Sequence, residues 1–310
     1  MTRKPANLPA SISGRLRNIA REKHTNLEFI LRRYAIERLL YRMSVSAHRD
    51  RFVLKGAMLF TAWLDDPFRP TQDLDLLGFG DAAVAAMTAA FREICAQAVD
   101  DDGLIFDGGN LVGAPIREDQ NYGGVRVRTV AFLGKTRIPV QIDIGFGDAI
   151  TPSATELAFP ALLDTPAPVL KAYPKETVVA EKFQAIAALG LANSRMKDYY
   201  DLLALSRLFS FDGPMLRDAI AATFARRSTG LPEEPPAGLQ DSFAADRQKI
   251  EQWTAFTGRE PLLLQAGDLA SVTAEVRNFV MPPAKAARRG TPFLLNWNAA
   301  GPWRDAGTRT

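Results

Sequence analysis

The chain has 310 residues, of which 47% are hydrophobic and 24% are charged, so it can build the core of one large domain or two ordinary ones. Its formal net charge is only +3, and its single cysteine excludes an internal disulfide. We therefore expect a protein of the reducing cytoplasm, and the lack of an apolar run of about 18 residues predicts no membrane span. Two histidines far apart do not favour a zinc site or a histidine-based hydrolase triad.

The first part of the chain predicts a mixture of helices and strands. Helical spacing extends from about residue 11 to residue 43, and RFVLKGAMLFTAWL predicts a short strand followed by a helix. DDPFRPTQ predicts a loop, DLDLLGF a strand, DAAVAAMTAAFREICAQAV an amphipathic helix, and residues 107–124 loop or edge structure. VRVRTVAFL and IPVQIDIGF alternate around GKTR, which predicts a β-hairpin.

The second part of the chain predicts helices. A connection punctuated by prolines covers residues 153–174, and helical patterns follow at residues 175–190, 196–209, 212–227, 239–257 and 262–283. We expect an α+β protein in two domains. Residues 1–172 would form N-terminal helices and a mixed β-sheet flanked by helices, and residues 173–310 a helical domain with a basic tail.

Three carboxylates are placed unusually for predicted strands. Asp73 and Asp75 are two residues apart, so both side chains lie on one face, and Asp143 stands in the return strand of the hairpin. Like charges repel on a half-buried strand, but carboxylates together with substrate phosphates are the ligands that Mg²⁺ or Mn²⁺ takes. The alternative for this pattern alone is two solvent-facing aspartates on an edge strand and an unrelated turn carboxylate.

A second group of residues indicates phosphate binding. Gly56 in KGAMLF stands between a predicted strand and a predicted helix, where a glycine allows close approach of an anion to the backbone. We expect Lys55, Gly56 and Ala57 to contact a triphosphate, with Arg69 and Thr71 upstream of Asp73. A tight turn without a ligand is the alternative.

Two helices contribute further charged residues. Lys182 interrupts the apolar face of its helix and needs an anionic partner such as an NTP, unless its ammonium reaches water. SRMKDYYDLL places Arg195, Asp198 and Asp201 at the start of the next helix, where an aspartate can also be a simple cap.

Basic residues are unevenly distributed along the chain. They gather at residues 15–23, at residues 32–33 and in the segment KAARRG at residues 285–290. This pattern is typical of an anionic partner such as RNA, and equally of solvated helix faces.

With these motifs assembled, the chain resembles the AbiEii/AbiGii family of nucleotidyltransferase toxins in the polymerase-β-like superfamily. LKGAMLF, RPTQDLDLLG, QIDIGFGD, ETVVAEKFQAI and SRMKDYYDLL carry the resemblance from about residue 52 to residue 205. Ala57 departs from the pattern, since the superfamily usually has glycine or serine there.

The resemblance implies a toxin of a toxin–antitoxin or abortive-infection system, with an antitoxin encoded by a neighbouring gene. Such an enzyme moves a nucleoside monophosphate from an NTP to RNA, with tRNA among the acceptors. By position, the resemblance assigns metal binding to Asp73, Asp75 and Asp143, triphosphate contact to Lys182, and the fourth-motif aspartate to Asp198 or Asp201. We also expect Arg195 to take part in nucleotide binding. A protein or small-molecule acceptor and a catalytically inactive binding module are the alternatives.

Overall fold

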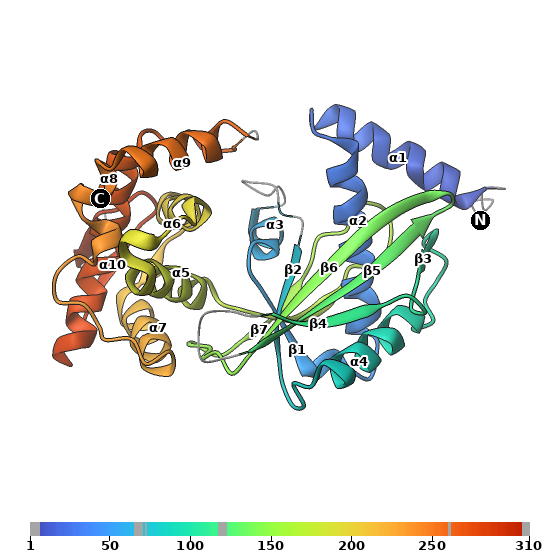
Figure 1. Cartoon of the computed structure of the whole chain (residues 1–310), viewed down its shortest axis with the longest axis horizontal. Coiled ribbons are helices and arrows are strands. Elements are labelled where there is room, and N and C mark those ends of the chain that lie inside the picture. Colours follow the sequence, from blue (N-terminus) through green and yellow to red (C-terminus); the bar gives the residue numbers. More distant parts are fainter. Residues whose placement is uncertain (1–6, 65–70, 72, 117–122, 260–261, 306–310) are drawn as a thin grey trace. The chain divides into compact units, whose positions relative to one another are not determined.

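The computed structural model of the chain describes residues 7–64, 71, 73–116, 123–259 and 262–305. Its elements fall into two units (Figure 1). The first unit consists of Met1–Gly147 and Thr155–Ala172, and the second of Asp148–Ala154 and Tyr173–Thr310. The sequence predicted a single boundary after residue 172, whereas the segment 148–154 groups with the second unit.

Two helices open the first unit where the sequence predicted one. Helix α1 spans Leu8–Glu22 and helix α2 spans Leu27–Ser44. The break has a local cause, because the side chain of Asn26 accepts a hydrogen bond from the backbone N–H of Glu28 and so caps a new helix. His24, in the break, has a left-handed φ of 48°, which a continuous helix does not allow. The prediction of an unbroken helix from residue 11 to residue 43 is therefore wrong at this point.

A mixed sheet forms the centre of the first unit and confirms the predicted fold class. Antiparallel pairs alternate in it with two parallel pairs, β2 with β6 and β1 with β8. Along the sheet the order is β3 (Leu104–Phe106), β5 (Gly124–Leu133), β6 (Thr136–Phe146), β2 (Asp73–Gly78), β1 (Phe52–Lys55), β8 (Val169–Ala172) and β7 (Thr155–Ala158), with β4 (Val112–Ile116) also paired to β5.

The sheet has one apolar face and one polar face. On β6, the buried Ile142 and Ile144 alternate with Gln141 and Asp143, as expected for side chains that point to opposite faces. Helices α2 and α4 (Val84–Ala96) pack on the apolar face, with α2 against β6 and α4 against β5 (Figure 1). Helix α3 (Met58–Leu64) follows β1. The charged side chains lie on the opposite face of the sheet, away from this apolar layer.

Strands β7 and β8 lie in the segment that the sequence predicted as a connection, so that prediction is wrong. Strand β8 pairs with β1 in parallel, with Leu54 opposite Ala172, and β7 pairs with β8 in antiparallel. Both strands are only four residues long. Prolines lie close to the ends of both strands, and β8 takes its partner β1 from a distant part of the sequence, so the local pattern did not predict either strand.

The second unit is mainly helical, as predicted. Its helices are α5 (Lys175–Leu189), α6 (Met196–Leu208), α7 (Gly213–Arg226), α8 (Asp241–Ala244), α9 (Arg247–Thr257) and α10 (Leu269–Arg289). Short 3₁₀ turns lie at Gly190–Ala192 and Ala237–Leu239, and in the first unit at Arg49–Arg51. The sequence missed a small antiparallel sheet of β9 (Phe211–Asp212), β10 (Leu295–Trp297) and β11 (Trp303–Asp305). Within the described ranges, no helix has the length and apolar character of a membrane span.

Candidate active site

A row of four charged residues crosses the polar face of the central sheet. Asp75 on β2 lies opposite Lys55 on β1 and opposite Asp143 on β6. Asp143 in turn lies opposite Arg126 on β5. Register partners in neighbouring strands share a face, so the four side chains follow one another across four strands. We call these four residues, Lys55, Asp75, Asp143 and Arg126, the charged row.

Asp73 stands two residues before Asp75 on the same face and has a different environment. The Nε2 amide of Gln141 donates a hydrogen bond to its Oδ1 atom, at 3.1 Å. Arg128 Nε donates in turn to the Oε1 atom of Gln141, at 3.1 Å. The amide of Gln141 is thus oriented from both sides and directs its N–H toward the Asp73 carboxylate.

Asp143 is held by a two-point ion pair with Arg126. The Nε of Arg126 donates to Oδ1 of Asp143 at 2.7 Å, and Nη2 donates to Oδ2 at 2.6 Å. This hydrogen bonding, with the negative charges of Asp143, Asp73 and Asp75, raises the pKa of Arg126 above its ordinary value. The carboxylate of Asp143 is only 19% exposed, so the pair is partly withdrawn from water. The positive charge of Arg126 therefore interacts with the negative charges of all three carboxylates.

Gly56 lets the turn after β1 pass close to Asp75. Its φ is +73°, and a Cβ atom added there would lie 2.1 Å from the Oδ2 atom of Asp75. Only glycine leaves room for the carboxylate against the backbone at this turn. Lys55 is half-buried, Ala57 is buried, and Thr71 is half-buried just before β2. Arg69, the other expected phosphate contact, lies outside the described residues.

The second unit contains a buried cluster of opposite charges. The Nζ of Lys182 on α5 lies 2.9 Å from Oδ1 of Asp198 and 2.7 Å from Oδ2 of Asp201, both on α6. Nε of Arg195 lies 2.7 Å from Oδ2 of Asp198. Both carboxylate side chains are 0% exposed, and that of Lys182 is 12% exposed. The anionic partner that a lysine on an apolar face requires is thus supplied, at least in part, by the chain itself.

The carboxylates of the first unit have the chemistry of a site for a hard divalent cation. All three donors are carboxylates on one face of two neighbouring parallel strands. As they stand, however, no three histidine, cysteine, aspartate or glutamate side chains in the described ranges are arranged to hold a metal ion. The guanidinium of Arg126 engages both oxygens of Asp143, the third donor. The donors are of the type that Mg²⁺ or Mn²⁺ takes, and Arg126 contacts one of the three.

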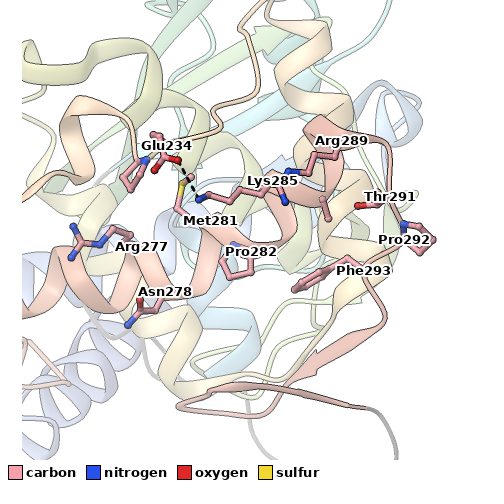
Figure 2. A pocket seen from close by; sticks show the side chains of 12 residues that line it. Glu234, Arg277, Asn278, Met281, Pro282, Lys285, Arg289, Thr291, Pro292 and Phe293 are labelled. Carbon is pink, nitrogen blue, oxygen red and sulfur yellow. Dashed lines mark ion pairs between the residues drawn. The ribbon is translucent and has the colours of Figure 1, made fainter.

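The predicted basic tail borders a groove of about 580 Å³ beside α10 (Figure 2). Lys285 lies 3.8 Å from Glu234, and Arg288 lies 3.5 Å from Glu233. Arg289 also pairs with Glu233. Acidic partners therefore offset much of the positive charge that the segment KAARRG brings to this surface.

The N-terminal basic segments are also partly engaged. Arg15 pairs with Asp164 at 2.6 Å and Arg32 with Glu28 at 2.8 Å. Arg33 is only 6% exposed, because it lies on the inner side of α2. The expectation that Arg33 contributes to a surface for an anionic partner is therefore wrong.

Sequence reasoning missed Arg126 and Gln141. The hairpin carried the signal, because its two-residue turn, Gly134 and Lys135, sets Leu133 opposite Thr136. Counting back from that turn places Arg126 opposite Asp143. Alternation alone assigns VRVR to a strand, whereas its cross-strand partners follow from the register of the hairpin.

A family model described as "Nucleotidyl transferase AbiEii toxin, Type IV TA system" matches residues 38–274. No curated protein matches. Two crystal structures from Helicobacter pylori align over 82% of this chain at 14% identity and a TM-score of 0.43. One, provisionally named a nucleotidyltransferase, is covered over 91% of its length, and the other, JHP933, over 88%.

The family match extends over most of the chain. It includes the charged row, Asp73, and the buried cluster of Lys182, Asp198, Asp201 and Arg195. The chain belongs to the AbiEii nucleotidyltransferase toxin family of type IV toxin–antitoxin systems.

Proposed function

We propose that this toxin transfers a nucleoside monophosphate from an NTP to an RNA acceptor, with tRNA ends as the preferred acceptor class. The observation that carries the proposal is the placement of Asp73, Asp75 and Asp143 on one face of two adjacent parallel strands. A divalent cation there would neutralise the phosphate charge and favour departure of pyrophosphate. Its protein ligands would be these three carboxylates.

In the proposed reaction, a hydroxyl of the acceptor attacks the α-phosphorus of the NTP. A new P–O bond forms to the acceptor, the bond to the β-phosphate oxygen breaks, and pyrophosphate leaves. Asp143 orients the hydroxyl or accepts its proton. Most of the rate enhancement then comes from positioning and charge, as in other phosphoryl transfers.

The family resemblance assigns triphosphate contacts to residues in each unit, and each unit is taken by itself. In the first unit we assign Lys55, Gly56, Ala57 and Thr71 to this role. Lys55 supports the assignment because its register position places it beside Asp75.

In the second unit we propose that Lys182 and Arg195 contact the triphosphate. Asp198 and Asp201 would hold the ammonium of Lys182 in place, since both carboxylates already contact it. Either aspartate can fill the fourth-motif role, because both face the same ammonium.

The direct test incubates the pure protein with each labelled NTP, Mg²⁺ and total RNA. We expect label to enter RNA with one preferred nucleotide, and Asp73→Asn or Asp75→Asn to abolish it while the fold stays intact. Asp81→Asn is the matched control, since Asp81 is an exposed carboxylate just past β2. Wild-type labelling by the Asp73→Asn, Asp75→Asn double variant would show that the carboxylates are not the metal site.

The same assay separates the acceptor classes. Label in a protein or in an aminoglycoside, and not in RNA, would favour the alternative acceptors, and no transfer to any acceptor would favour the inactive binding module. If RNA is the acceptor, its affinity should fall steeply with salt, because bound phosphates release counterions. Replacing one contacting cation, such as the exposed Arg17 or Arg21, should reduce the log–log slope by about one.

Toxicity provides the test in cells. Expression without the antitoxin gene should arrest growth, and co-expression of the antitoxin should restore it. Growth arrest by a stably folded Asp75→Asn variant would separate toxicity from nucleotidyl transfer.

A further inference from the structure

Arg126 contacts both oxygens of Asp143, which is one of the three proposed cation ligands. A two-point contact from a guanidinium uses the outward lone pairs of both carboxylate oxygens. Each oxygen keeps a further lone pair, but a divalent cation that coordinates Asp143 would bring a second positive charge beside this guanidinium. Arg126 and the cation therefore compete for one carboxylate.

The neighbouring carboxylate Asp73 differs from Asp143 in this respect. The amide of Gln141, a neutral group on the same strand as Asp143, donates a hydrogen bond to the Oδ1 atom of Asp73. An amide at 3.1 Å can orient one oxygen of Asp73 and adds no positive charge beside an incoming cation. The contacts described thus place a guanidinium against both oxygens of Asp143 and a neutral amide against one oxygen of Asp73.

We propose that Arg126 is a positioning residue that replaces the divalent cation in the metal-free enzyme and sets how tightly the cation binds. Its guanidinium offsets the repulsion among Asp73, Asp75 and Asp143 until a cation arrives, and then it releases Asp143. Arg126 acts through Asp143 and stabilises the carboxylates at the cost of cation affinity. This inference rests on the proposed metal role of the three aspartates.

The test measures binding of Mn²⁺ alone, by electron paramagnetic resonance of the free ion, to the full-length chain. We expect Arg126→Gln to bind Mn²⁺ about tenfold more tightly than the wild type, because a unit charge within about 5 Å changes the affinity of a carboxylate for a proton by roughly tenfold or more. Arg126→Lys keeps the charge and loses the two-point contact, so its affinity should lie between the two.

The matched control is Arg137→Gln. Arg137 is an exposed arginine on the same strand and face as Asp143, six residues earlier, which places it about 20 Å away along the strand. At that distance its charge is screened, so Mn²⁺ affinity should stay at the wild-type value.

The second measurement is thermal unfolding with and without Mn²⁺. In EDTA, Arg126→Gln should unfold at a lower temperature than the wild type, and Mn²⁺ should raise its unfolding temperature by more than that of the wild type. Equal or weaker Mn²⁺ binding by a folded Arg126→Gln variant would overturn the competition, while the metal site itself would stand. Binding that survives in the Asp73→Asn, Asp75→Asn variant, or that is absent from both the wild type and Arg126→Gln, would instead overturn the metal role and this inference with it.

Discussion

Replacing Lys182 with alanine should destabilise the second unit strongly. The lysine ammonium lies 2.9 Å from Asp198 and 2.7 Å from Asp201, whose side chains are both fully buried. Without the ammonium, the buried Asp201 loses a cation at ion-pair distance. Asp198 still has Arg195, 2.7 Å away.

The size of the loss follows from the burial of the two carboxylates. Removing one partner of a buried ion pair costs about 3–5 kcal/mol, and the remaining contact with Arg195 places Lys182→Ala near the lower end. A loss of about 3 kcal/mol is a large part of the roughly 5–15 kcal/mol that stabilises a typical domain. It should lower the unfolding temperature by about 6–12 °C.

Urea unfolding followed by circular dichroism at pH 7 measures this loss. The matched control is the triple variant Lys182→Met, Asp198→Asn, Asp201→Asn, which removes the three buried charges together. It should recover most of the stability, because neutral groups of similar volume avoid the desolvation cost. A loss below about 1 kcal/mol in Lys182→Ala, typical of a solvent-exposed ion pair, would refute the reasoning.

This result decides how toxicity assays on Lys182 are interpreted. Loss of growth arrest in Lys182→Ala supports a triphosphate contact only if the variant is folded at the assay temperature. Growth arrest that persists in a folded variant would exclude the triphosphate role.

Three further predictions follow from the first unit. Gly56→Ala should reduce transfer at least about tenfold, because the added Cβ displaces Asp75. The control Gly80→Ala has a φ of +86° and no atom within 4 Å of the added Cβ, so it should cost only about 1–2 kcal/mol of backbone strain and leave transfer intact. Equal activity of the two variants would contradict this prediction. Burial raises the pKa of Glu37 above its ordinary 4.5, so the stability that this group contributes is full below pH 4.5 and is lost as pH rises through the folded-state pKa. Glu37→Gln should flatten this part of the stability curve, and urea midpoints measured against pH would show no difference if the reasoning fails. Burial also raises the pKa of Cys95 to about 12, so iodoacetamide at pH 8 should alkylate it only as the chain unfolds, and labelling as fast as that of the urea-denatured chain would contradict this.

Much of the site was predictable because side-chain direction along a strand is a local property. The spacing of Asp73 and Asp75 placed both on one face, and the alternation of IPVQIDIGF placed Asp143 on the polar side of its strand. The helical periodicity of residues 175–283 was equally local, and it predicted the helices that carry Lys182 and Asp198.

The break between α1 and α2 was also a local feature, and the sequence carried its signal in Asn26. The apolar spacing continued across it, so periodicity alone predicted one helix. Capping decided otherwise, because the Asn26 side chain satisfies a backbone N–H that a new helix leaves without a partner.

The partners of the charged residues were decided only by the tertiary structure. Arg126 meets Asp143 across a hairpin, Lys182 meets Asp201 across two helices, and β8 meets β1 from more than a hundred residues away in sequence. Periodicity determines which way a side chain points, since the backbone imposes it residue by residue. Which group it meets depends on how distant segments pack, and for this reason the sequence predicted three carboxylates and a lysine in need of partners but not the guanidinium and the aspartates that contact them.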